Sequence, residues 1–363
     1  MNAAVKVAVP LLAVAGLVLS GCTSGTTPEN TAAAGGLSEQ DSAHLPADWP
    51  DVVAAAEEEG EVIIYTTFPE AQIALLIADF NTIYPNIRVQ PVIDSSATLP
   101  ARWSQEHEAT GSSPGDLTHS AAFETMIVEN PDWFVDLTED ADFLPSLNDF
   151  RAEAVPADRP LSVTVAGYTW QAIINTDLVS EADMPADYMD LTDAEWNGQL
   201  KFSDPRSNAF YSQVYFSANE AAGGGLLEGL AANNPSYTTD DITQPVAAGE
   251  FAIGWPTNAA RAAALEAANA PVVRVTLQPA LAGQTTMAVA SDGPHPNAAR
   301  VFANYLLTVQ GQEKQCEVAT LGSLNDLVGG PCNGLEIPED ATFLPLITTD
   351  QESAAVLNGL ELN

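Results

Sequence analysis

The sequence predicts an α/β protein built from two lobes, and three observations lead there. A strand, a polar turn and a helix follow one another repeatedly along the chain, which is the pattern of a parallel sheet covered by helices. The length of 363 residues exceeds what one hydrophobic core usually holds. A β-rich, aromatic segment at 162–175 is interpreted as a strand pair that carries the chain into a second set of such units.

The first strand–turn–helix unit opens at Gly60. Val62–Tyr65 is a run of β-forming apolar residues, typical of a strand buried on both faces. Thr67 and Glu70 then have the spacing of a capping box. The helix that follows repeats its apolar residues at i, i+4, i+7 and i+11: Ile73, Ile77, Phe80 and Tyr84. The hydroxyls before it either cap this helix or face a ligand at the carboxyl edge of the sheet, where helix N-termini offer unpaired N–H groups.

Two further units repeat this arrangement. A strand at 88–92 leads through Asp94-Ser95-Ser96 into a helix at 98–108. A short strand at 116–118 leads through His119-Ser120 into a helix at 121–129. Three successive strand ends therefore place small hydroxyl residues before helices, which predicts one convergent edge. His119 is either a ligand contact at that edge or an ordinary turn residue.

The second lobe shows two comparable units. A strand within 196–205 ends at Ser203-Asp204 and is followed by Ser207-Asn208 and a helix that continues to Glu220. A buried strand at 251–255 leads through a turn to Asn258 and a helix at 259–268. The segment 285–291 then returns to the first lobe, and 295–312 is predicted to form a single amphipathic helix.

Composition limits the possible functions. An apolar content of 46% is enough for a core and excludes global disorder. The chain has 49 acidic and 11 basic residues, so it lacks the basic footprint that would neutralise the phosphates of a nucleic acid. A solvated acidic surface that favours solubility is the simplest explanation of the charge. No cofactor and no resident metal is predicted.

The N-terminal residues are predicted to form a secretory signal peptide. Residues 1–22 combine Lys6, an apolar stretch and the ending Leu19-Ser20-Gly21-Cys22, which looks like a bacterial lipobox. Lipid on the Cys22 sulfur would anchor the protein to the outer face of the cell membrane. Residues 23–47 are predicted to be a flexible tether. In that oxidising compartment Cys316 and Cys332 are expected to form a disulfide, although spacing alone does not establish it.

Several segments together resemble a known family. WNGQLKFSDPRSNAFY and HPNAARVFANYLLTVQGQEKQ are similar to a "W.GK…DPRS" segment and an "HPNAA…F…LLS…GQE" helix of bacterial extracellular solute-binding proteins of ABC importers. EGEVIIYTTF, FNTIYPNIRV and GDLTHSAAF resemble the opening units of the same proteins. The similarity extends from Asp48 to Gly322, and its nearest branch is the ferric-iron-type binders with their organic-ligand relatives.

The resemblance implies a type 2 periplasmic-binding-protein fold, in which two α/β lobes joined by two crossover strands close on a ligand. Lobe 1 would comprise 48–165 and 283–363, and lobe 2 would comprise 166–282. The protein would be a non-catalytic monomer that delivers a small solute to an ABC permease and its ATPase. The expected ligand-binding residues carry hydroxyl, amide or aromatic groups: Thr66, Thr67, Phe68, Ser95, Ser96, Ser120, Tyr168, Trp170, Ser207, Asn208, Tyr211, Trp255 and Asn258.

The ligand class follows from what those positions contain. The ferric-iron branch supplies two adjacent tyrosines after the strand that here ends at Trp255, together with a histidine and a carboxylate from the first lobe. This chain continues Pro256-Thr257-Asn258 and has no Tyr-Tyr pair. Neutral donors at helix N-termini instead favour a phosphonate, phosphate ester or carboxylate, with Arg102 or Arg206 as a source of charge unless Arg206 faces solvent beside Asp204. Ferric iron is the alternative ligand.

A secreted hydrolase is the alternative of another class. Residues 111–115 read Gly-Ser-Ser-Pro-Gly and match the G-x-S-x-G pattern around Ser113. That motif requires a strand before it and a helix after it, whereas the order predicted here is the reverse. A turn is therefore the preferred interpretation. Loss of turnover in a Ser113→Ala variant would identify a hydrolase instead.

Overall fold

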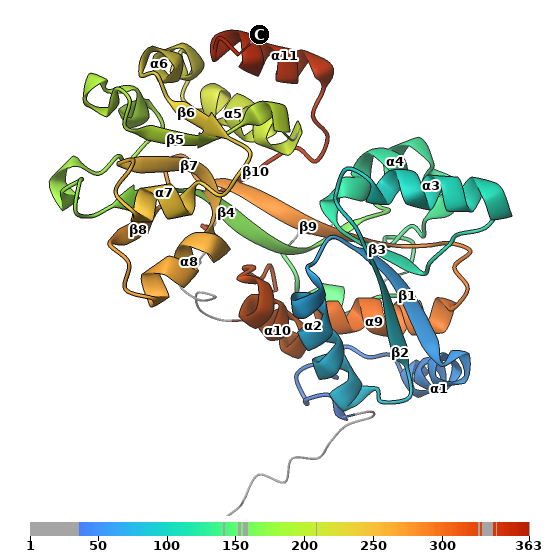
Figure 1. Ribbon diagram of the computed structural model, residues 1–363. Coiled ribbons are helices and arrows are strands. Elements are labelled where there is room, and N and C mark those ends of the chain that lie inside the picture. The colour runs from blue at the N-terminus through green and yellow to red at the C-terminus, as the bar shows by residue number, and fades with distance from the viewer. Residues whose placement is uncertain are drawn as a thin grey trace, which may run out of the picture.

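The computed structural model describes residues 36–140, 142–151, 154, 159–207, 209–325, 327–328, 337–338 and 340–362. Figure 1 shows two lobes joined by long strands near the middle of the molecule. One ten-stranded sheet passes through both lobes in the order β2-β1-β3-β9-β4-β7-β5-β6, with β10 paired to β9 and β8 paired to β4. The predicted architecture of two α/β lobes is confirmed.

Lobe 1 holds the first three strand–helix units. Its strands are β1 (Glu61–Thr66), β2 (Arg88–Ile93) and β3 (Leu117–His119), and β1 is parallel to both neighbours. Its helices are α1 (Trp49–Glu59), α2 (Glu70–Ile83), α3 (Leu99–Thr110), α4 (Glu124–Glu129), α9 (Pro296–Leu307) and α10 (Val309–Ala319). Short 3₁₀ turns at η2 (Ala121–Phe123), η3 (Pro131–Trp133) and η4 (Pro145–Asp149) connect them. Each of the predicted strands and helices before residue 130 is found within three residues of its expected place.

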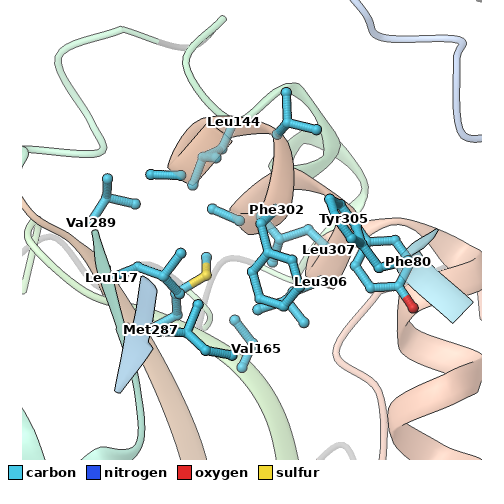
Figure 2. Close-up of a cluster of buried hydrophobic side chains, with 14 of the residues drawn as sticks. Phe80, Leu117, Leu144, Val165, Met287, Val289, Phe302, Tyr305, Leu306 and Leu307 are labelled. Carbon is cyan, nitrogen blue, oxygen red and sulfur yellow. The ribbon is translucent and has the colours of Figure 1, made fainter. Parts of the chain in front are cut away.

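The core of lobe 1 forms where α9 lies against the sheet. Figure 2 shows Phe302 and Leu306 of α9 directed toward Leu117, Val165 and Met287 of the strands. All five side chains are fully buried. Each such side chain contributes roughly 1.5–3 kcal/mol through the hydrophobic effect. This packing fixes α9 against β3, β4 and β9, and the candidate site lies where β3 and its parallel neighbour β1 end.

Lobe 2 continues the same sheet. Its strands are β5 (Leu200–Ser203), β6 (Ser236–Thr238), β7 (Ile253–Asn258) and β8 (Val272–Val275). Its helices are α5 (Ala209–Ala221), α6 (Leu226–Ala232), α7 (Thr243–Ala247), α8 (Ala259–Ala267) and α11 (Asp350–Gly359). The 3₁₀ turns are η6 (Glu181–Asp183), η7 (Met189–Thr192), η8 (Ala194–Trp196) and η9 (Pro205–Ser207). Trp255 is the centre of its aromatic core, with ring centroids 4.8 Å from Tyr215 and 5.9 Å from Phe202 and from Tyr188.

Two long strands cross between the lobes. The segment expected as a strand pair is one strand, β4 (Val163–Asn175), which pairs with β9 (Leu281–Val289) in its first half. From Trp170 onward β4 pairs with β7 of lobe 2. At its other end β9 pairs with β3 of lobe 1. β4 and β9 are thus the two crossover strands that the resemblance implied.

Both ends of the described chain differ from the predicted domain limits. Residues 36–47 do not behave as a tether, because Leu37 is buried in the lobe 1 core and the Asp41 carboxylate accepts a hydrogen bond from the Val309 N–H at 2.6 Å. The C-terminal helix α11 was assigned to lobe 1, but it packs on α5 and α6. Its Val356 and Leu360 belong to the lobe 2 core. Between α10 and α11, the short strand β10 (Thr342–Phe343) pairs with β9.

The helix expected at 295–312 is divided in two. Thr308 is extended (ψ 158°), and its Oγ1 accepts a hydrogen bond from the Gly311 N–H at 3.0 Å, which caps α10. Gly311 allows this sharp change of direction, since a Cβ there would lie 1.9 Å from the Tyr305 carbonyl oxygen. The amphipathic pattern continues across the break, so periodicity alone could not show it.

Two predictions concern the N-terminal segment and the cysteines. Cys22 and the rest of the signal segment lie outside the described residues. Cys316 is disulfide-bonded, and Cys332 also lies outside the described residues, so their pairing stays a prediction. Within the described part, none of the helices combines the length and the apolar character that a membrane span requires.

Candidate functional site

The strands β1 and β3 end side by side in lobe 1. Thr66 and His119 are register partners at these ends, and Thr67 and Ser120 follow them. The Thr67 hydroxyl donates to Ser120 Oγ at 3.1 Å. Ser120 Oγ also accepts from the Ala122 N–H at 3.2 Å and so caps the 3₁₀ turn η2. The predicted convergence therefore holds for these two turns, whose hydroxyls touch each other.

A buried layer supports this pair. Thr66 Oγ1 accepts from the Phe68 N–H at 3.1 Å and lies 3.3 Å from His119 Nδ1. The Phe68 ring covers His119, with 4.6 Å between ring centroids. His119 is fully buried, and this burial lowers its pKa to about 4, an effect that the neighbouring Gln315 side chain partly offsets. His119 is therefore a neutral packing residue beneath the turn, which answers the question left open by the sequence.

The helix α2 begins at Glu70 without the predicted capping box. Its N-cap is Pro69, and none of the described side chains caps it. The Thr66 hydroxyl instead lies against His119 of β3 and the Phe68 N–H, and the Thr67 hydroxyl donates to Ser120, so the interpretation of these threonines as simple helix caps is wrong. The first turn of α2 consequently starts beside the Thr67–Ser120 pair with no side chain on its leading N–H groups. Such a helix terminus favours negative charge.

The turn after β2 is placed differently. Ser95 and Ser96 are exposed at the end of β2, which is the edge strand of the sheet. The Ser95 N–H donates to Asp94 Oδ1 at 2.7 Å, and Ser95 Oγ lies 2.9 Å from Thr98 Oγ1. The Ser95 hydroxyl therefore makes a local turn contact, and the described contacts do not join Ser95 or Ser96 to the Thr67–Ser120 pair.

An aromatic group forms around β4 at the junction with lobe 2. The Trp170 ring lies 5.4 Å from Tyr168, 5.8 Å from Phe210 and 5.9 Å from Tyr211, measured between centroids. Trp170 is buried, whereas the other three are half-buried. Burial, and then the nearby Tyr211, raises the pKa of the Tyr168 phenol. Phe210 was missed from sequence, although its place beside Tyr211 in a motif-bearing segment was an available signal.

The remaining lobe 2 positions lie in different surroundings. Ser207 is exposed and donates its hydroxyl to the Asp204 carbonyl at 2.6 Å. Asn258 is paired with Trp170 across β7 and β4, which places its backbone beside the aromatic group. Trp255 is fully buried in the lobe 2 core, where it packs on other rings. Asn208 lies outside the described residues.

Both arginines proposed as charge sources are engaged in local ion pairs. Arg206 holds the Asp204 carboxylate with Nε–Oδ1 and Nη2–Oδ2 distances of 3.0 and 2.7 Å, and this guanidinium lowers the Asp204 pKa. Arg102 Nε lies 2.9 Å from Glu106 on the next turn of α3. Each positive charge already has a carboxylate partner. Hydroxyl, backbone N–H and ring groups therefore dominate the candidate site.

The G-x-S-x-G segment forms a turn between α3 and β3, as the sequence analysis preferred. The Ser113 hydroxyl is buried and donates to Asp292 Oδ1 at 2.5 Å. A helix precedes it and a strand follows, opposite to the arrangement of a nucleophile elbow. As for metals, the described residues contain no group of three or more His, Cys, Asp or Glu side chains that could hold an ion.

Comparison with known proteins assigns the family. The model of a family described as bacterial extracellular solute-binding protein matches residues 64–315. The chain belongs to this family. The match includes β1, β3, β4 and α5, which supply the hydroxyl pair and the aromatic group. None of the curated protein sequences matches this solute-binding protein.

Solved structures share the fold at low identity. A substrate-binding protein of an ABC transporter from Agrobacterium tumefaciens has a TM-score of 0.66 and 15% identity, covering 85% of this chain and 96% of its own. Iron-bound HitA from Pseudomonas aeruginosa has a TM-score of 0.63 and 19% identity, and the alignment covers 83% of this chain and 98% of HitA. The periplasmic binding protein AfuA from Actinobacillus pleuropneumoniae, with fructose-6-phosphate bound, has a TM-score of 0.61 and 16% identity, and the alignment covers 84% of this chain and 99% of AfuA. At these identities the similarity concerns the fold, which is that of two-lobed periplasmic binding proteins.

Proposed function

We propose that this solute-binding protein captures a small polar or anionic organic solute between its lobes and delivers it to an ABC permease and its ATPase. The solute belongs to the phosphonate, phosphate ester or carboxylate class. Lipid on Cys22 would hold the protein on the outer face of the cell membrane. The family supports the role of a receptor, whereas the ligand class and the anchor are inferences from the residues.

One observation carries the ligand class. Thr67 and Ser120 bring two hydroxyls within 3.1 Å of each other at the point where α2 begins without a side-chain cap. Hydroxyl donors beside a helix N-terminus suit an oxyanion, because the partial positive charge and the N–H groups act on the same oxygen atoms. The aromatic group around Trp170 then provides the apolar surface that small-ligand sites usually combine with a few polar contacts.

The test is a thermal-shift screen with methylphosphonate, glycerol 3-phosphate, citrate, spermidine and glucose. A receptor is stabilised by the solute it binds, as mass action requires, and does not convert it. For the best anionic probe, Thr67→Val and Ser120→Ala should each weaken binding about tenfold, the loss of one hydrogen bond to a charged group. Thr82→Val is the matched control, since Thr82 is exposed near the far end of α2 and donates to Asp79.

Other outcomes would redirect the proposal. Ferric citrate is added to the screen as a sixth probe, and stabilisation by it with a coloured complex would favour a ferric-iron receptor. Stabilisation by spermidine or glucose alone would overturn the anionic class while leaving the receptor role intact. Turnover of any probe, abolished by Ser113→Ala, would favour a hydrolase.

A further inference from the structure

The crossing of β4 and β9 brings one tyrosine onto one glycine. Tyr168 of β4 is the direct register partner of Gly283 of β9. Two residues further along, β4 leaves β9 and pairs with β7 of lobe 2. The pair therefore lies at the junction of the two lobes, and Tyr168 belongs to the aromatic group around Trp170.

Gly283 leaves the space that the tyrosine ring occupies. A Cβ built on Gly283 would lie 2.4 Å from Cζ, 2.6 Å from Cε2 and 2.7 Å from the hydroxyl oxygen of Tyr168. All three separations are far below van der Waals contact, so the ring rests directly on the glycine backbone. Facing side chains in a non-glycine pair would hold the ring away from the strand. The position of the Tyr168 hydroxyl thus depends on the absent side chain.

The neighbouring glycine on β4 has a different contact. A Cβ on Gly167 would lie 2.6 Å from Ile337 Cδ1. Because neighbouring residues of a strand point to opposite faces of the sheet, this Cβ and the Tyr168 ring lie on opposite sides of β4. Gly167 also exchanges backbone hydrogen bonds with Gly322, at 2.9 and 2.7 Å. Both glycines lie on crossover strands at the same level, but of the two only Gly283 faces the tyrosine ring across the strand pair.

We propose that Gly283 is a positioning residue of the ligand site, which it serves by letting the Tyr168 ring lie against β9 in contact with Trp170. This rests on the proposed function, in which Tyr168 contacts the solute. In that position the Tyr168 and Trp170 rings meet edge to face, with centroids 5.4 Å apart and an interplanar angle of 71°. A methyl group at position 283 rotates the phenol off β9, and the site loses a hydroxyl and part of an aromatic surface together.

A ligand-free double-mutant cycle tests the geometry. Gly283→Ala should lower the melting temperature by about 2–4 °C in the otherwise wild-type protein. In a Tyr168→Ala background the same change should have no effect or should raise it slightly, because the ring is gone and alanine reduces the entropy of the unfolded chain. Equal losses in both backgrounds would overturn the proposal. The double variant also keeps the test valid if Gly283→Ala alone folds poorly.

Calorimetric titration with methylphosphonate, glycerol 3-phosphate or citrate, whichever binds the wild type, tests the role in the site. Gly283→Ala and Tyr168→Ala should each weaken binding about tenfold, with no further loss in the double variant. Gly167→Ala should lower the melting temperature in both Tyr168 backgrounds and leave the affinity within about twofold. If Tyr168→Ala weakens binding and Gly283→Ala does not, the inference about Gly283 fails while the proposed function stands. If none of the three probes binds, the proposal of an anionic ligand is wrong. The double-mutant cycle on the melting temperature then still tests whether the Tyr168 ring lies on Gly283.

Discussion

The two lobes contribute to the candidate site in different ways. In lobe 1 the Thr67–Ser120 pair comes from the first and third strand–turn–helix units, 53 residues apart, whose parallel strands bring their ends together. In lobe 2 the aromatic group joins β4 to the start of α5, forty residues later, and depends on a strand that begins in the other lobe. A repeated strand–turn–helix unit is visible in sequence even when its copies are far apart, whereas a group formed by unlike segments depends on how the chain packs.

The two ends of the described chain, in contrast, play the same part in the two lobes. Leu37 and Asp41 complete lobe 1 from the N-terminal side, and α11 completes lobe 2 after the chain has passed the crossover strands a third time. Along this path Leu344 also links to β9, because the Gln284 side chain donates to its carbonyl at 3.1 Å. Each lobe is therefore completed by a short terminal segment, and the composition of these segments does not show to which lobe they belong.

Of the changes considered, removal of α11 should cause the largest loss in the free energy of unfolding, and the loss should fall on lobe 2. A chain ending at Thr348 loses Val356 and Leu360 from the lobe 2 core, which corresponds to about 3–6 kcal/mol of the free energy of unfolding. Urea unfolding followed by tryptophan fluorescence would measure it, since Trp255 reports on that core. Val356→Ala should give a smaller loss, and Ala355→Ser, at an exposed position, none. A truncated chain with the wild-type midpoint would show that lobe 2 is complete without α11.

Acidification should destabilise lobe 1 through His119. The folded protein holds this residue neutral down to about pH 4, whereas the unfolded chain takes up the proton near pH 6.5. Stability is therefore complete above about pH 6.5 and is lost as the pH falls toward 4, by about 3 kcal/mol from this residue. Denaturant unfolding of wild type and His119→Gln between pH 4 and 8 would measure the difference. Parallel pH profiles for the two proteins would contradict a buried neutral imidazole.

The N-terminal contact of lobe 1 should have the smallest effect of the three. Asp41 is buried and accepts hydrogen bonds from the Val309 N–H at 2.6 Å and from the Ser38 hydroxyl at 3.0 Å. Asp41→Ala should lower the free energy of unfolding by about 2 kcal/mol, because the α10 N-terminus loses its partner. Thermal unfolding would detect it. Glu39→Ala is the matched control, as Glu39 is exposed on the same turn. An equal effect of both changes would mean that residues 36–47 contribute only through their charge.

The sequence by itself determined the α/β class, the succession of strands and helices in lobe 1, the long β-segment that leaves it, and the hydroxyls at the β1 and β3 ends. These depend on local periodicity and on the rule that parallel strands share a carboxyl edge, so short-range patterns were sufficient. It also pointed to Trp170, which lies in the aromatic β-rich segment 162–175, and to Tyr211, which lies in one of the segments that carry the family resemblance.

Only the tertiary structure decided which of those residues meet. Trp255 lies within β7 and is buried in the lobe 2 core, and Ser95 is exposed after the end of the edge strand β2. Both were predicted to contact the ligand together with Thr67 and Ser120. The break at Thr308, the placement of α11 and the contact of Tyr168 with Gly283 all arise between segments distant in sequence. Burial and close approach are properties of the packed chain, and a linear pattern of apolar and polar residues does not contain them.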